Sequence, residues 1–223
     1  MGSDVIQIIV LAAIALFLVL RLRNLLGTRT GFEPPREQRP TMSDAPARDE
    51  RPFEVIEGGG VDHDIADVVD PDSDTGTALA AMKRIEPDFS VQEFLHGARG
   101  AYEMILMAYE SGDLPTLEQF LAPDVYDGFR QAVEARADQG LEVEARFVGI
   151  RELTLKGARF DEETGEADVT VRFTGELASV VRDRDGRVVE GDLSEIKQQR
   201  DTWTFSRAMG SDNPNWLLVA TGD

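Results

Sequence analysis

The stretch from Ser90 to Gly112 reads SVQEFLHGARGAYEMILMAYESG, and the predicted fold is organised around it. Ser90 and Glu93 have the spacing of a capping box, in which each side chain bonds the free backbone N–H of the other residue. Apolar residues then recur at helical intervals, and Gly112 supplies a left-handed stop. The pattern predicts one long amphipathic helix over residues 88–112.

Two shorter helices and a run of strands follow this helix. Asp113 opens a helix that extends to Leu121, and another begins at Pro123 and ends at Gln139. After Gly140 the apolar residues alternate with polar ones, which is typical of half-buried antiparallel strands. We therefore predict about four strands after the helices.

Turn-forming residues separate the predicted strands. Residues 161–165 form one turn, Asp185-Gly186 closes a hairpin, and residues 213–215 lead into a last strand over residues 216–219. Helices followed by strands give a segregated α+β domain, in which a curved antiparallel sheet wraps the leading helix. Such a sheet forms a cone with an apolar mouth.

The candidate hydrophobic pocket of this cone is largely aromatic. Aromatic side chains at these positions either pack a core or line a ligand cavity, and the sequence leaves both open. The candidate pocket residues are Phe94, Ala98, Tyr102, Phe129, Phe147, Phe173, Trp203, Phe205 and Trp216.

An uncharged apolar stretch lies near the N-terminus. Residues 5–20 read VIQIIVLAAIALFLVL, and as a helix they span roughly 24 Å of a hydrocarbon layer about 30 Å thick. Two following arginines can snorkel and so extend the apolar length. We predict a transmembrane anchor over residues 1–26, formed by Val5, Ile6, Ile8, Ile9, Val10, Leu11, Ile14, Leu16, Phe17, Leu18, Leu20, Arg21 and Arg23.

A cleaved signal peptide and an interfacial helix are weaker interpretations of the same stretch. The core is followed by Leu-Arg-Leu-Arg rather than a small-x-small site, and its helix is apolar all round. Arg21, Arg23 and Arg29 follow the span, whereas Asp4 is the only charged side chain before it. The positive-inside rule therefore predicts a single-pass inner-membrane protein whose soluble domain is cytoplasmic.

Residues 27–87 differ in composition from both flanking regions. Prolines, a triple glycine at residues 58–60 and scattered acidic side chains predict a disordered linker. Two apolar islands interrupt it: residues 53–56 are a docking peptide or an adhesive patch, and residues 77–85 are a short helix that packs on the domain. The domain itself is assigned to residues 88–223.

Composition excludes several function classes. The formal net charge is -19, which repels nucleic-acid phosphates and anionic lipid surfaces. The chain has no cysteine and two histidines, so thiolate chemistry is excluded and metal sites lose their usual ligands. His96 is expected at a helix edge, residues 161–163 in a solvated turn, and no catalytic motif is present. We expect no enzyme activity, no metal and no cofactor.

Several motifs, in order, resemble one family. FLHGARGAY at residues 94–102, VTVRF at 169–173, DTWTF at 201–205 and NPNWLLVAT at 213–221 are similar to the translocase forty-four-like family. This family is the C-terminal domain of the motor-anchor subunit of the mitochondrial inner-membrane translocase. GTRTGF at residues 27–32, after the anchor, resembles its bacterial membrane-anchored branch.

The resemblance implies a cone like that of nuclear transport factor two and a non-enzymatic adaptor role at the inner membrane. It implies a protein partner, either a translocon component or a heat-shock chaperone, and association with cardiolipin-rich membrane. The chaperone-binding region is replaced here by an anchor and an acidic linker, and the domain is acidic. The alternative is a cone that binds a lipid or a small hydrophobic ligand.

Overall fold

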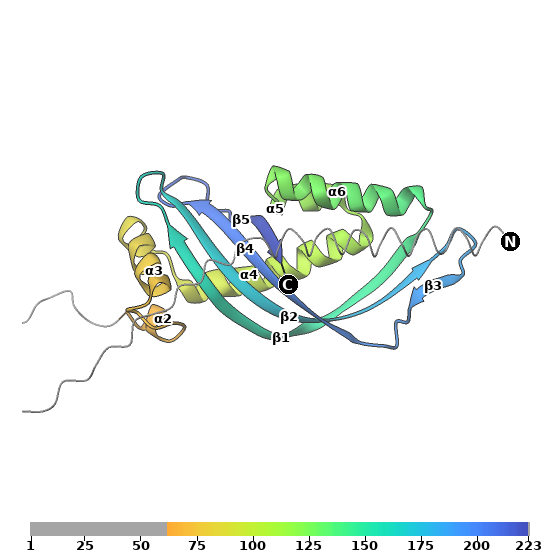
Figure 1. Cartoon of the computed structure of the whole chain (residues 1–223), viewed down its shortest axis with the longest axis horizontal. Coiled ribbons are helices and arrows are strands. Elements are labelled where there is room, and N and C mark those ends of the chain that lie inside the picture. Colours follow the sequence, from red (N-terminus) through yellow and green to blue (C-terminus); the bar gives the residue numbers. More distant parts are fainter. Residues whose placement is uncertain (1–61, 223) are drawn as a thin grey trace, which may run out of the picture. The chain divides into compact units, whose positions relative to one another are not determined.

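The computed structural model describes residues 62–222, an α+β domain in which helices precede an antiparallel sheet (Figure 1). The predicted anchor over residues 1–26 and most of the predicted linker over residues 27–87 lie outside the described residues. Between residues 62 and 222, no helix is both long enough and apolar enough to cross a membrane.

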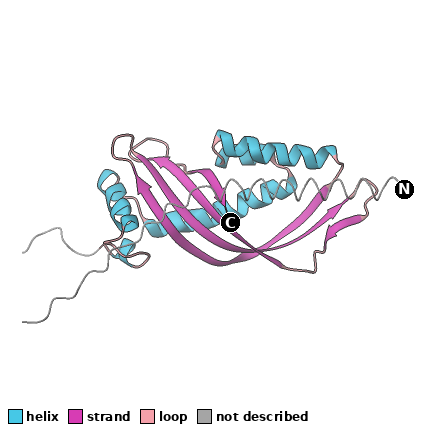
Figure 2. Cartoon of the chain, viewed as in Figure 1, coloured by secondary structure: helices cyan, strands magenta, loops and turns pink. Residues whose placement is uncertain are grey.

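Helix α4, Val91–Ser111, is the long helix expected from the sequence (Figure 2). The hydroxyl oxygen of Ser90 accepts the backbone N–H of Glu93 at 3.3 Å, so half of the expected capping box is confirmed. Gly112 ends the helix with a φ of 74°, which is the left-handed conformation expected of a C-terminal glycine. The sequence therefore specified both ends of this helix to within a few residues.

Two helices follow α4, as predicted. Helix α5 is Leu114–Phe120, and its N-cap Asp113 accepts the backbone N–H of Thr116 at 3.2 Å. Helix α6 is Pro123–Asp138, and Figure 1 shows it lying alongside the C-terminal half of α4.

The sheet has five strands in the order β1-β2-β4-β5, with β3 paired to β2, and every pair is antiparallel. Register shifts interrupt the long β1–β2 pairing, and such bulges bend a strand. Figure 1 shows the bent sheet curving around α4. The strands are β1 Glu142–Phe160, β2 Glu166–Arg182, β3 Val188–Gly191, β4 Lys197–Ala208 and β5 Leu217–Gly222.

Burial follows the predicted alternation on the sheet face that meets α4. Val169, Val171 and Phe173 of β2 are fully buried, and Trp203 and Phe205 of β4 are almost so. These side chains share one face because neighbouring strand residues point to opposite sides. The core of the domain therefore lies between α4 and the concave face of the sheet.

The β2–β3 hairpin is confirmed, but its loop is longer than the two residues expected. Residues 183–187 connect the strands, and the carboxylate of Asp183 accepts the backbone N–H groups of Asp185 and Arg187. An aspartate that bonds the backbone beyond it stabilises a wider turn than Asp-Gly alone forms. The last strand also begins one residue later than predicted, at Leu217.

The prediction of a disordered linker is wrong for its last part. Helix α2, His63–Ala66, and helix α3, Asp74–Ile85, both lie within it, and α3 packs against β1. Leu79 and Met82 are fully buried, so the expectation of a packed helix at residues 77–85 is confirmed. The prolines that suggested disorder lie before and after α3, where they bound the helix and do not interrupt it.

Candidate functional site

A groove with a cavity volume of about 600 Å³ lies beside the first half of α4. Its walls come from the α3–α4 connection, α4, the end of α5, β4 and the β4–β5 loop. Five of its lining side chains are aromatic, so we call it the aromatic groove: Phe89, Phe94, Phe120, Phe205 and Trp216.

The space in the groove comes from small residues on α4. Gly97, Ala98 and Ala101 line it where larger side chains would fill it. A Cβ atom added at Gly97 would meet no other atom within 4 Å. The small residues of α4 therefore form the bottom of the groove, and aromatic rings of β4 and of the β4–β5 loop form its sides.

A partly buried ion pair holds the Trp216 wall in place. The Arg207 guanidinium lies 5.3 Å from the centroid of the Trp216 ring and donates a hydrogen bond to the Glu86 carboxylate at 2.6 Å. The side chain of Arg207 is only 7% exposed, and Gly210 donates its backbone N–H to the same carboxylate oxygen. The bond from Arg207, aided by Gly210, holds the pKa of Glu86 below its ordinary value although burial opposes it. Glu86 therefore stays ionised at neutral pH and keeps Arg207 against the tryptophan.

The rim of the groove is acidic. Asp88 and Glu93 line it, and neither forms an ion pair with another described residue. Arg207 is the one basic side chain among its described lining residues, and its charge is already matched by Glu86. The groove therefore combines an aromatic interior with excess negative charge, which favours a ligand that is apolar and basic.

Four of the nine candidate pocket residues lie in this groove: Phe94, Ala98, Phe205 and Trp216. Three others form what we call the aromatic core: Tyr102, Phe173 and Trp203. The Tyr102 ring stacks on Phe173 with centroids 4.4 Å apart and lies 4.7 Å from Trp203. The structure thus divides the predicted pocket into an open part and a filled part.

The remaining two candidates lie outside the groove. Phe147 contacts the aromatic core edge-on, with its ring 6.2 Å from Tyr102. Phe129 of α6 packs on Tyr109 of α4, with ring centroids 5.1 Å apart. Both residues are half-buried and cover the core from its flanks.

The Tyr102 hydroxyl is a buried donor. It donates to the Asp201 carboxylate at 2.6 Å and accepts from the Gln199 amide at 3.2 Å. Burial, and next the hydrogen bond to Asp201, raise the pKa of Tyr102 well above its ordinary value. A Cβ atom at Gly175 would lie 2.6 Å from the hydroxyl, so the strand must carry a glycine there. Tyr102 is therefore a neutral, closely packed phenol.

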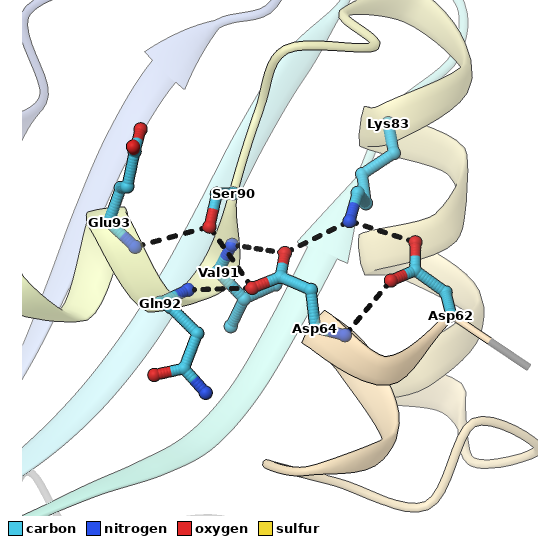
Figure 3. Close-up of polar contacts among 7 residues, drawn as sticks. All are labelled: Asp62, Asp64, Lys83, Ser90, Val91, Gln92 and Glu93. Atoms are coloured by element: carbon cyan, nitrogen blue, oxygen red, sulfur yellow. Dashed lines mark hydrogen bonds and ion pairs between the residues drawn. The ribbon is translucent and has the colours of Figure 1, made fainter.

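A second polar cluster joins the N-terminal helices to the rim of the groove (Figure 3). The Asp64 carboxylate accepts the Ser90 hydroxyl at 3.0 Å and the Val91 backbone N–H at 2.7 Å. Lys83 of α3 forms ion pairs with Asp64 at 2.9 Å and Asp62 at 2.8 Å. Burial would raise the pKa of Asp64, but the bonds from Lys83 and the start of α4 hold it below its ordinary value. Because Ser90 lines the groove, α2 and α3 are tied to its edge.

Sequence reasoning missed Glu86, Arg207 and Phe89. Arg207 follows Trp203 and Phe205 at the two-residue spacing of the buried face of β4, and that alternation was a usable signal. Phe89 had been placed inside the long helix, but α4 begins two residues later. Glu86 carried no local signal, since its role depends on an arginine 121 residues further along the chain.

The other chemical candidates are simple surface features. His96 is exposed, as expected from its place on the helix. Asp161 accepts the backbone N–H groups of Glu163 and Thr164 and so supports the predicted turn. Within residues 62–222, no group of three or more histidine, aspartate or glutamate side chains could hold a metal ion.

Comparisons with known proteins place the chain in a family. The intermembrane space region of the chloroplast protein ARC6 aligns with 57% of this chain and 94% of its own, at 10% identity and a TM-score of 0.40. The mitochondrial import inner membrane translocase subunit TIM44 of Rattus norvegicus is 25% identical over 144 residues, 63% of this chain and 31% of the relative. Subunit TIM44-1 of Arabidopsis thaliana is 21% identical over 154 residues, 66% and 32% of the two chains.

The chain thus spans about a third of the length of these relatives. The family model described as the Tim44-like domain matches residues 75–223, from the start of α3 to the last residue. This match covers more than half of the sequence and confirms the resemblance seen in its motifs, and the chain belongs to the Tim44-like domain family.

Proposed function

We propose that this protein is a non-enzymatic adaptor with a role in protein translocation, whose Tim44-like domain binds a protein partner in the aromatic groove. One observation carries the proposal: an open aromatic groove has a rim with two carboxylates, Asp88 and Glu93, that no described cation neutralises. An apolar side chain next to a lysine or arginine would satisfy both features. The relatives named above, subunits of a mitochondrial import translocase, support this class of role.

The proposal includes an anchor in the bilayer. Residues 1–26 would span the inner membrane of a bacterium once, with the domain on the cytoplasmic side, as Arg21 and Arg23 predict. The connecting chain would give the domain reach toward a translocon component or a chaperone. The curved sheet around α4 supports a likeness to the cone of nuclear transport factor two.

Packing supports a role without catalysis. Tyr102 is fully buried, so its hydroxyl is a structural donor to Asp201 and not an acid that a substrate reaches. Among the described residues that line the groove there is no histidine, and the one basic side chain is held in the pair with Glu86. These contacts fit recognition better than proton transfer.

A lipid or a small hydrophobic ligand is the second candidate for the groove. The volume of about 600 Å³ lies within the range of small-molecule pockets, and the walls are aromatic. The acidic rim disfavours a lipid with an anionic headgroup, because the rim carboxylates and the headgroup would carry like charges, which repel each other. We therefore rank a basic protein segment first.

Two matched glycines on α4 allow a direct test. Gly97 lines the groove and Gly100 does not, and a Cβ atom at either position would meet nothing within 4 Å. A photoreactive amino acid at Phe120 in the full-length protein should form a crosslink to a specific protein in membranes. Gly97→Leu should abolish that crosslink and Gly100→Leu should preserve it.

The same samples separate the two candidates. Recovery of lipid alone on Phe120, lost in Gly97→Leu, would replace the protein partner by a lipid ligand. Equal crosslinking in both leucine variants would remove the groove from the proposal. The anchor has its own test: deletion of residues 5–20 should release the chain from carbonate-washed membranes, and retention would contradict single-pass anchoring.

A further inference from the structure

A hydrogen-bond donor in the wall of the aromatic groove has no partner among the described residues. The Nε atom of Arg207 is buried, and no described residue accepts a hydrogen bond from it. The only other buried side-chain polar atom in this condition among the described residues is the Thr202 hydroxyl oxygen, and Thr202 does not line the groove. Because buried donors are nearly always bonded, the exception at Arg207 needs an explanation.

The pair with Glu86 leaves most of the donors of Arg207 unused. A guanidinium carries five N–H groups. Both hydrogen bonds from Arg207 to described residues come from Nη2, one to the Glu86 carboxylate at 2.6 Å and one to the Met209 sulfur at 3.3 Å. The side chain is only 7% exposed, and the open space that it borders is the groove. Glu86 therefore balances the charge of Arg207 but does not satisfy its donors.

The charges around the groove decide which kind of acceptor fits these donors. Besides Arg207, the groove is lined by three carboxylates: Glu86, Asp88 and Glu93. Three negative charges against one positive charge leave an excess of two negative charges. A carboxylate or phosphate on a ligand would be repelled by this excess, whereas a neutral oxygen would not. The neutral acceptor that a protein partner carries at every residue is its main-chain carbonyl.

The need for a free carbonyl also restricts the conformation of the ligand. Inside a helix, each carbonyl already accepts the N–H four residues further along, and only those of the last turn are free. An extended or irregular segment offers carbonyls along its length. A non-helical segment is therefore the better fit to Arg207.

We propose that the partner segment in the aromatic groove is not helical, and that one of its main-chain carbonyls accepts a hydrogen bond from Arg207. The segment then makes three kinds of contact: an apolar side chain against Trp216, a basic side chain toward Asp88 and Glu93, and this carbonyl. Arg207 is thus a specificity-determining residue of the groove. The inference rests on the proposed function, since it names the chemistry of the partner in the same groove.

An arginine-to-lysine substitution tests the contact in the full-length protein. Arg207→Lys keeps a positive charge for Glu86 but removes the Nε and Nη1 donors. With the photoreactive amino acid at Phe120, its yield of partner crosslink in membranes should be roughly tenfold below the wild-type yield. Arg130→Lys is the matched control and should keep the wild-type yield, because Arg130 also pairs with carboxylates but does not line the groove.

The Nε–H group itself reports whether Arg207 touches the ligand. The full-length protein in detergent is labelled with isotope-labelled arginine, and the Arg207 signal is the one that Arg207→Lys lacks. A synthetic peptide with the sequence of the segment crosslinked at Phe120 should shift this signal to lower field, as a new hydrogen bond does, and leave the Arg130 signal in place. If Arg207 only holds Trp216 in position, a saturating amount of peptide leaves the Nε–H signal unbonded, and the inference is wrong.

The outcomes also separate this inference from the proposed function. If Arg207→Lys unfolds at the wild-type temperature and gives the wild-type crosslink yield, the carbonyl contact is wrong and the protein-binding groove stands. If the wild type gives no crosslink, or one that Gly97→Leu does not reduce, the proposed function fails and the inference fails with it.

Variants of the partner give a measurement that does not depend on the folding of Arg207→Lys. Mass spectrometry identifies the partner segment that is joined to Phe120, and each of its residues is replaced in turn by alanine and by proline. Proline keeps the carbonyl and breaks a helix. At most positions where alanine preserves the crosslink, proline should preserve it too. Loss of the crosslink with proline at most of these positions would show that the bound segment is a helix and would overturn the proposal.

Discussion

The aromatic groove and the aromatic core are built on the same two elements, α4 and β4, and both are lined by aromatic side chains. In the core, Tyr102 occupies the space between helix and sheet, and its ring stacks on Phe173. In the groove, Gly97 and Ala98 face the equivalent space and leave it open. The size of the α4 side chain thus decides which aromatic residues form the fold and which line a cavity.

The largest expected effect comes from removing an aromatic ring from the core, and removal of a groove ring is the matched comparison. Phe173→Ala deletes a fully buried ring from the core and should lower the free energy of unfolding by about 3–5 kcal/mol. Phe120→Ala removes a half-buried groove ring and should cost less than about 1 kcal/mol. Denaturant unfolding of the full-length variants measures both, and equal losses would mean that the groove is part of the core.

The next effect concerns the contact between the N-terminal helices and the groove. Asp64→Asn weakens the bonds to Lys83 and the start of α4, and should cost about 1–2 kcal/mol at neutral pH. Phe173→Ala, in the core, leaves the bonds between Asp64, Lys83 and the start of α4 in place.

Two carboxylates, Asp64 in this contact and Glu86 in the pair with Arg207, predict the acid sensitivity of the protein. The pKa values of Asp64 and Glu86 are lowered on folding, so their contributions are present above the unfolded values and are lost as pH falls through the folded ones. Unfolding midpoints measured below pH about 4 should therefore fall more steeply for the wild type than for Asp64→Asn. Parallel curves would remove Asp64 from this account.

A smaller effect tests whether the buried phenol of Tyr102 supports the core alone or also affects binding in the groove. Tyr102→Phe keeps the ring in the core and removes the hydrogen bond to Asp201, which should cost about 1 kcal/mol. Partner crosslinking at Phe120 should be unchanged, because Tyr102 does not line the groove. Loss of crosslinking in a folded Tyr102→Phe protein would show that core and groove act together.

The smallest effect is a gain. Gly97→Leu and Gly100→Leu place a good helix former at open positions of α4, and each should raise stability by about 0.5–1 kcal/mol. The two variants should differ in binding and not in thermal unfolding. A loss of stability confined to Gly97→Leu would show that the groove floor has less space than the structure indicates.

The elements were largely predictable because their signals are local. Ser90 and Gly112 mark the ends of α4 through side-chain capping and a left-handed residue, both of which act within one helical turn. Val169, Val171 and Phe173 reveal a half-buried strand because strand side chains alternate. The family motifs in these elements also led to the Tim44-like domain.

The linker error has the opposite origin. Residues 62–87 carry prolines and acidic side chains that suggest disorder, yet Ile65 of α2 and Leu79 and Met82 of α3 gain enough burial against the domain to order the two helices. This burial depends on the surface of β1, against which α3 packs and which lies much later in the sequence. Composition alone cannot report it.

By itself the sequence determined an α+β domain with its helices before its sheet, the caps of α4, and the aromatic character of the residues between them. The tertiary structure alone decided that Tyr102 fills a core while Trp216 borders a groove, and that Glu86 holds an arginine 121 residues further along the chain, Arg207. The reason is physical: capping and alternation act over a few residues of one chain segment. Whether an aromatic ring is covered, or a carboxylate is paired, depends on which distant residue occupies the space beside it.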